Sequence, residues 1–134
     1  MGRVTGIGGI FFYAQDPALL HEWYKNNLGI DIQDWGGTAF AWEDEQGQPI
    51  KGTSVFSIAD IKSDQFAPGK SNFMINFRVD DLAELVHSLH RAGCEVVDEI
   101  QDSEFGKFGW VIDPEGNKIE LWQPPLGQIG RAHV

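Results

Sequence analysis

The chain has 134 residues, of which 42% are hydrophobic and 22% are charged, values typical of one globular domain. Its net charge of −10 opposes binding to phosphate backbones and to anionic lipid, so nucleic acid and membranes are not expected partners. Cys94 is the only cysteine in the sequence, which excludes an intramolecular disulfide and favours a reducing, cytoplasmic location.

The first half of the chain predicts a strand, a helix and then three further strands. The apolar run at residues 7–14 is expected to be a strand that leads directly into the helix. Asp16 is a favourable N-cap for that helix, Pro17 fits its first turn, and Gly29 is a favourable stop. Strand-like runs then follow at IDIQDW (30–35), TAFAWED (38–44) and GTSVFSIA (52–59).

The second half repeats this order of elements. An offset of 65 residues aligns Gly9 with Met74, and it aligns Asp16 with Asp81, which opens a second predicted helix. Three strand-like runs follow that helix, at CEVVDEI (94–100), FGWVID (108–113) and NKIELWQ (117–123). The duplication predicts two modules within one domain, at about 4–59 and 71–123, joined by the polar linker 60–70.

Three segments carry a resemblance to a known superfamily. They are GIGGIFFYAQDPALLHEWYKNNLGI in the first module, FRVDDLAELVHSLHRAGCEV in the second, and DPEGNKIELWQP at its end. The chain resembles the vicinal oxygen chelate superfamily, which includes glyoxalase I, bleomycin-resistance proteins, fosfomycin-resistance enzymes and extradiol dioxygenases. The resemblance implies an α+β fold in which two tandem βαβββ modules form a half-open barrel with a central cleft. It also implies a homodimer as an expected assembly.

The resemblance further implies where a metal would bind. Members that use a metal place its ligands at equivalent positions on the first and last strands of each module, which here are Gly9, Ser57, Met74 and Glu120. Only Glu120 offers a good donor, whereas a zinc or iron site needs three or four. No metal or other cofactor is therefore predicted, and a divalent metal at a relocated position remains the alternative.

Strand alternation predicts which side chains face the cleft. The expected lining residues are Phe11, Tyr13, Trp42, Ser57, Asn76, Arg78, Trp110, Glu120 and Trp122. Aromatic side chains in a cleft suit a planar or cationic organic ligand, although packing within the core explains them equally well. Arg78 and Glu120 would either orient a ligand or pair with each other, and Glu120 and Tyr13 are the candidate catalytic residues.

Two classes of function fit these features. The first is a binding protein with a degenerate metal site that holds a small aromatic or amphipathic molecule, as the bleomycin-resistance branch does. The alternative is a lyase, isomerase or dioxygenase-type enzyme of the same superfamily, which would use a relocated metal or none. The sequence does not decide between binding and catalysis, and it does not identify the ligand.

The remaining candidates for metal or thiol chemistry are expected to be structural. His21, His87 and His90 flank the apolar stripes of the two predicted helices, so they are expected on the solvent side. Cys94 begins a predicted strand and is expected to be a small buried side chain.

The end of the chain is expected to lie outside the folded domain, which covers residues 1–127. Pro124 and Pro125 end the last strand, and residues 128–134 are expected to be a non-native tail. The DNA string ATCGGAAGAGCACACGTC, which resembles a common short-read sequencing adapter that continues with the stop codon TGA, would translate into the last six residues.

Overall fold

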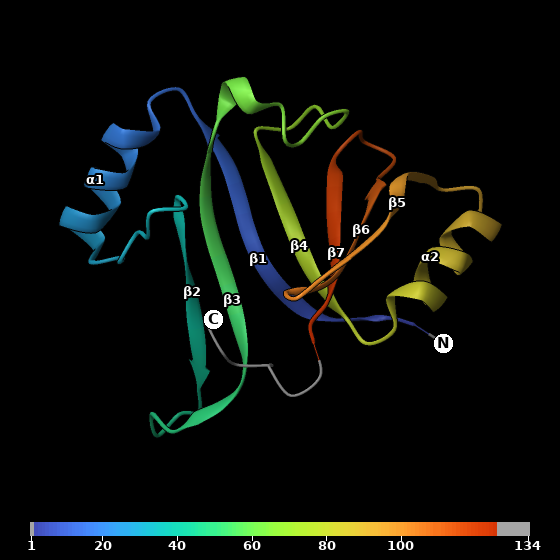
Figure 1. Ribbon diagram of the computed structural model, residues 1–134, viewed down its shortest axis with the longest axis horizontal. Coiled ribbons are helices and arrows are strands. Elements are labelled where there is room, and N and C mark those ends of the chain that lie inside the picture. Colours follow the sequence, from blue (N-terminus) through green and yellow to red (C-terminus); the bar gives the residue numbers. More distant parts are fainter. Residues whose placement is uncertain (1, 126–134) are drawn as a thin grey trace.

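Within residues 2–125 the chain forms one mixed sheet of seven strands, with one α-helix beside each half of it (Figure 1). The structure is a computed structural model, which describes residues 2–125. Its elements are β1 (Val4–Ala14), α1 (Pro17–Leu28), β2 (Gly37–Glu43), β3 (Pro49–Asp60), the short 3-10 helix η1 (Ile61–Ser63), β4 (Phe73–Val79), α2 (Leu82–Arg91), β5 (Glu95–Ser103), β6 (Gly106–Ile112) and β7 (Lys118–Gln123). The strand order is β2-β3-β1-β4-β7-β6-β5.

The strand pairing repeats itself, as the internal duplication predicts. In the first half β1 pairs in parallel with β3, and β3 pairs antiparallel with β2. In the second half β4 pairs in parallel with β7, and β7 pairs antiparallel with β6. The two halves join through an antiparallel pair of β1 and β4 at the centre of the sheet.

The first module has one strand fewer than predicted. The run IDIQDW at 30–35 was expected to be a strand, but it forms a loop in the structure. Short-range hydrogen bonds hold this loop: Gln33 Nε2 donates to Asp31 Oδ2 at 2.8 Å, and the Gly36 amide donates to the Gln33 carbonyl. Aspartate and glycine favour such turns, and here they override the strand-like alternation. The corresponding run in the second module is the edge strand β5.

The two helices begin as predicted but are anchored very differently. The Asp16 and Asp81 side chains accept hydrogen bonds from the amides of Leu19 and Glu84, as N-caps do. Leu82 of α2 is fully buried, in a cluster with Val79, Val111 and Leu121. By contrast, α1 has no buried residue, and its tryptophan, Trp23, is 50% exposed.

The two faces of the sheet separate the helices from the predicted cleft. Paired residues point to the same face. Ile10 pairs with Ile75 on the face that the helices cover, and Gly9 pairs with Asn76 on the opposite face. We call this opposite face the inner face; its side chains are those of Phe11, Tyr13, Val55, Ser57, Met74, Asn76, Arg78, Phe108, Trp110, Lys118, Glu120 and Trp122.

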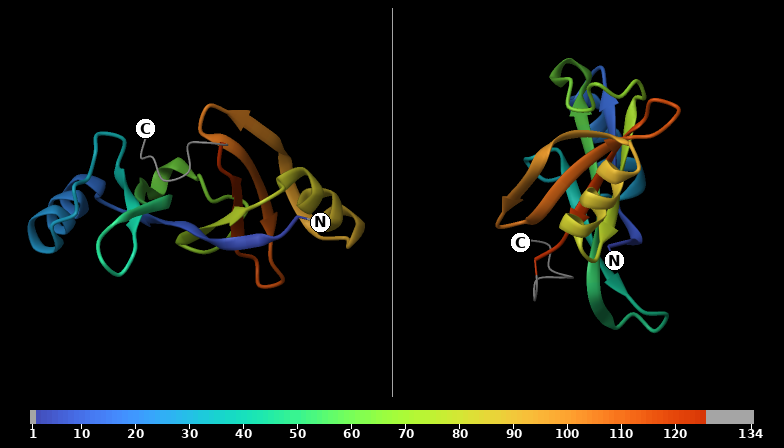
Figure 2. Two further views of the ribbon diagram at one scale, coloured as in Figure 1. Left: turned by 90° about the horizontal axis from the view of Figure 1, so that it is seen from below. Right: turned by 90° about the vertical axis from the view of Figure 1, so that its right-hand side faces the viewer.

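The sheet curls around its inner face (Figure 2). As a result, Arg78 on β4 lies over the ring of Trp42 on β2, although β3 and β1 stand between these two strands. The curl brings side chains from both modules together.

Several peripheral residues can also be placed. His87 and His90 are exposed on α2, as expected. Cys94 was expected to be buried, but it is exposed, because the turn after α2 leaves it at the surface before β5 begins. Neither helix within residues 2–125 is long and apolar enough to cross a membrane. The predicted tail at 128–134 lies outside the described residues.

Candidate functional site on the inner face

Glu120 lies at the middle of the inner face, and two neighbours hold its carboxyl group. Asn76 Nδ2 donates to Glu120 Oε1 at 2.7 Å from the adjacent strand β4. Trp110 Nε1 donates to Glu120 Oε2 at 2.9 Å from the adjacent strand β6. Each carboxyl oxygen therefore has a fixed partner, and Glu120 points inward as the strand alternation predicts.

Burial changes the acid–base behaviour of this carboxyl group. Loss of hydration raises the pKa of Glu120 above its ordinary value of 4.5. The hydrogen bonds from Asn76 and Trp110, and then the positive charge of Lys118, act in the opposite direction but do not cancel this effect. Glu120 therefore accepts a proton more readily than a carboxyl group at the surface.

The substitution Glu120→Gln is expected to change how stability depends on pH. Because the folded pKa is raised, the contribution of Glu120 to stability is fully present below its unfolded pKa, and it is lost as pH rises through the folded pKa. Glutamine stays neutral, so the stability of the variant relative to wild type should increase as pH rises through this window. Urea unfolding of both proteins between about pH 4 and pH 8 measures the difference.

The exposed residue Glu99 provides the control for this experiment, since Glu99→Gln should shift stability little at any pH. A Glu120→Gln difference that stays flat, or that falls as pH rises, would contradict a raised pKa.

Arg78 lies between two indole rings near one end of the inner face. Its guanidinium carbon is 4.8 Å from the ring centroid of Trp42 and 5.1 Å from that of Trp122. Nη1 donates to the Thr53 carbonyl at 3.3 Å, and Arg78 is only 6% exposed. Burial lowers the pKa of Arg78. Arg78 thus bridges the two modules, because Trp42 and Thr53 belong to the first and Trp122 to the second.

The salt bridge considered from the sequence, between Arg78 and Glu120, is absent. The ion pair found within residues 2–125 joins Arg3 to Asp80 at 3.9 Å, on the surface. Arg78 and Glu120 each have other partners, since Asn76 and Trp110 occupy the carboxyl oxygens of Glu120. Arg78 and Glu120, the two groups expected to orient a ligand, therefore do not pair with each other.

The other end of the inner face is closed by the linker between the modules. Phe66 is 1% exposed, and its ring stacks on Tyr13 with centroids 4.1 Å apart. The Phe66 amide also donates to the Tyr13 hydroxyl at 2.7 Å. Lys118 Nζ donates to the Gln65 carbonyl and lies 5.6 Å from the centroid of Trp110. The hydroxyl of Tyr13, a candidate catalytic residue, thus accepts a hydrogen bond from the linker.

The four positions that the resemblance marks as metal-ligand positions are Gly9, Ser57, Met74 and Glu120. Gly9 and Met74 offer no hard donor, and the hydroxyl of Ser57 is a weak one. A Cβ atom at Gly9 would lie 2.5 Å from the Val55 carbonyl oxygen, so a ligand side chain has no room there. In the same part of the chain, no group of three or more histidine, cysteine, aspartate or glutamate side chains could hold a metal ion.

Two residues that shape this site were not predicted from the sequence. Phe66 was missed because the composition of the linker is polar. Gly8 lies at an irregularity in the β1–β4 pairing, and a Cβ atom there would overlap Asn76 Oδ1 and approach Arg78 Cγ and Trp122 Cε3 to 3.1 Å each. The signal for Gly8 was present, since a glycine inside a strand often marks a close approach of other atoms.

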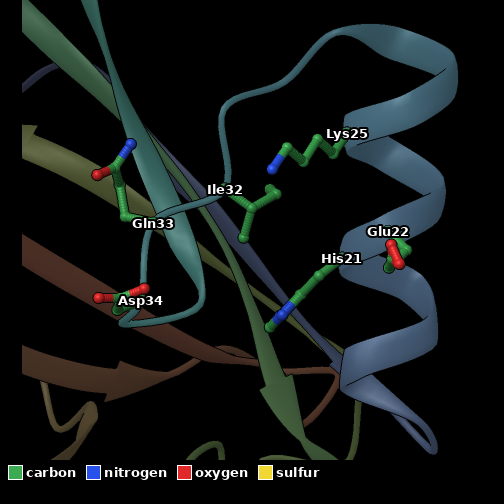
Figure 3. A pocket seen from close by; sticks show the side chains of 6 residues that line it. All are labelled: His21, Glu22, Lys25, Ile32, Gln33 and Asp34. Atoms are coloured by element: carbon green, nitrogen blue, oxygen red, sulfur yellow. The ribbon is translucent and has the colours of Figure 1, made fainter.

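A separate hollow lies between α1 and the loop that follows it (Figure 3). It is a cavity of about 330 Å³ lined by His21, Glu22, Lys25, Ile32, Gln33 and Asp34. His21 was expected on the solvent side, but its ring points toward this loop, and its Nε2 atom is buried without a hydrogen-bond partner among the described residues. Gly36, just after the loop, lies close to the ring, since a Cβ atom at Gly36 would be 3.7 Å from His21 Nε2.

Comparison with known proteins identifies the class. The family model of the glyoxalase-like domain matches residues 9–122. The chain therefore belongs to this family, within the vicinal oxygen chelate superfamily, which confirms the resemblance seen in the sequence. No curated protein matches the sequence significantly.

Solved structures share the fold at low sequence identity. A variant of Streptomyces coelicolor methylmalonyl-CoA epimerase in complex with 2-nitronate-propionyl-CoA aligns with a TM-score of 0.65 and 17% identity, covering 96% of this chain and 99% of that one. Methylmalonyl-CoA epimerase from Mycobacterium tuberculosis aligns with a TM-score of 0.57 and 19% identity, covering 91% of this chain and 89% of that one. A glyoxalase/bleomycin resistance protein/dioxygenase superfamily member from Vibrio splendidus 12B01 aligns with a TM-score of 0.54 and 15% identity, covering 92% of this chain and 99% of that one. Such identities show the fold alone.

Proposed function

We propose that this glyoxalase-like protein binds a small aromatic or amphipathic molecule on its inner face without using a metal. One observation carries the proposal: Trp110 and Trp122 lie on the inner face, Trp42 of β2 reaches it at Arg78, and all three tryptophans remain only half-buried. The cluster beneath α2, by contrast, is made of fully buried aliphatic side chains. Indole rings that keep free surface beside fixed polar groups are suited to stacking with an organic ligand.

Tryptophan fluorescence tests this proposal directly. Trp23 and Trp35 are 50% and 58% exposed and do not belong to the inner face, so the double variant Trp23→Phe/Trp35→Phe removes their emission. The three remaining tryptophans should then report ligand binding, and a panel of aromatic compounds should include some that quench them in a saturable way. Emission that stays unchanged across the panel would instead identify these tryptophans as packing residues.

The degenerate metal site has its own test. The dialysed protein is expected to contain well under one zinc, iron, manganese or nickel ion per chain, because only Glu120 among the four equivalent positions is a good donor. Elemental analysis of the purified protein measures this content. One retained ion per chain that disappears in Glu120→Ala would contradict the proposal.

An enzyme that moves a proton is the second candidate function. The raised pKa of Glu120 favours it, since a carboxyl group that protonates readily can act as a general acid or base. Structural neighbours named as epimerases provide a further reason to consider it. Recovery of the bound compound distinguishes the candidates, because a binding protein returns it unchanged.

A further inference from the structure

The buried guanidinium of Arg78 lacks a carboxylate partner within residues 2–125. Its hydrogen-bond acceptor there is the neutral Thr53 carbonyl, and Glu120 is fully engaged by Asn76 and Trp110. A buried cation without a counter-ion is costly, and a bound anion would offset that cost. The inner face therefore holds a positive group whose charge no described side chain neutralises.

The two indole rings beside Arg78 exclude one class of ligand. Aromatic walls attract organic cations, and the sequence led us to expect a planar or cationic ligand for that reason. In the structure Arg78 itself occupies the cation position between Trp42 and Trp122. A second cation would be repelled there, so the site beside Trp42 and Trp122 favours an anionic ligand.

Arg78 still has donors to offer. Among residues 2–125, the buried side-chain nitrogen and oxygen atoms without a partner are His21 Nε2, Asn76 Oδ1 and Ser88 Oγ. Nε and Nη2 of Arg78 are not among these atoms, and neither donates a hydrogen bond to another residue within 2–125. These two nitrogens lie on one edge of the guanidinium, the arrangement that binds both oxygens of a carboxylate.

We infer that the ligand of the inner face is an aromatic carboxylate, whose carboxylate binds the Nε–Nη2 edge of Arg78 and whose ring packs against the neighbouring indoles. The inference rests on the proposed function and specifies its ligand class. The rings of Trp42 and Trp122 position the guanidinium. Gly52 lets Trp42 lie there, because a Cβ atom at Gly52 would overlap the Trp42 ring.

Three compounds that share one ring system but differ in charge test the inference on the wild-type protein. The probes are 2-naphthoate, 2-naphthamide and 2-naphthylmethylammonium, measured by isothermal titration calorimetry. We expect the carboxylate to bind about 10- to 100-fold more tightly than the amide, as charged hydrogen bonds allow, and the ammonium to bind most weakly. Equal or tighter binding of the amide or the ammonium would overturn the inference while leaving the proposed function intact. Failure of all three to bind would overturn both.

Two variants locate the effect at Arg78. Arg78→Gln should remove the preference for the carboxylate over the amide, and Arg78→Lys should recover part of it, because lysine keeps the charge but loses the bidentate edge. The matched control is Arg3→Gln, which removes an exposed arginine on the same chain and should leave the preference unchanged. Retention of the preference in a folded Arg78→Gln protein would overturn the inference.

Inorganic phosphate provides the last arm of the experiment. If a simple anion site were present, phosphate would raise the melting temperature of the wild-type protein as much as 2-naphthoate does. We expect a clearly larger shift with 2-naphthoate, because its ring also contacts the indoles. Equal shifts would overturn the requirement for an aromatic group.

Discussion

Replacing Phe66 by alanine is expected to lower the free energy of unfolding by about 3–5 kcal/mol, as for other fully buried phenylalanines. Phe66 is 1% exposed and packs with Ala59 and Met74, and its ring stacks on Tyr13. Its loss would leave a cavity where the linker between the modules covers the inner face. Chemical denaturation followed by circular dichroism measures the change.

Phe105→Ala is the matched control for this substitution. Phe105 is 56% exposed, so its removal should cost about 0.5 kcal/mol or less. Similar losses in the two variants would mean that Phe66 does not anchor the linker. A milder variant, Phe66→Leu, keeps most of the apolar volume and should recover much of the stability.

The substitution Gly8→Ala is expected to destabilise the protein by about 1–3 kcal/mol, the usual cost of overpacking. The new Cβ atom would overlap Asn76 Oδ1 and press on Arg78 and Trp122. Asn76 would have to move away from Glu120, so the pH dependence associated with Glu120 should change together with the stability. Unfolding measurements at several pH values follow both effects at once.

The same strand supplies the control for Gly8→Ala. Gly6 also lies in β1, and a Cβ atom there would meet nothing within 4 Å. Gly6→Ala should therefore cost little, or should stabilise slightly by restricting the unfolded chain. Equal effects at the two glycines would indicate a general loss of backbone freedom rather than a contact with the inner face.

The fold could be predicted from the sequence because several weak local signals agree with one another. The duplicated strand and helix, the aspartate caps and the alternation in the last strand each hold in the structure. The strand predicted at 30–35 fails because turn-forming side chains compete locally with the apolar pattern. Local hydrogen bonds decide between a turn and a strand, and the alternation of polar and apolar residues does not describe these bonds.

The inward direction of Glu120 could likewise be predicted, because it depends only on alternation within β7. The partners of Arg78 could not be predicted from the sequence. They depend on how far the sheet curls and on which residue of β2 reaches β4. The role of Phe66 was hidden for a different reason. One apolar residue in a polar linker carries no periodic signal, although the space next to Tyr13 buries it.

The exposed position of Cys94 matters for any measurement of assembly. A surface thiol that is the only one in the chain can join two molecules covalently when air oxidises it. A species of twice the monomer mass could therefore be a chemical artefact unless a reductant is present. The same thiol is a useful attachment point, because a maleimide dye would modify a single site in the turn between α2 and β5.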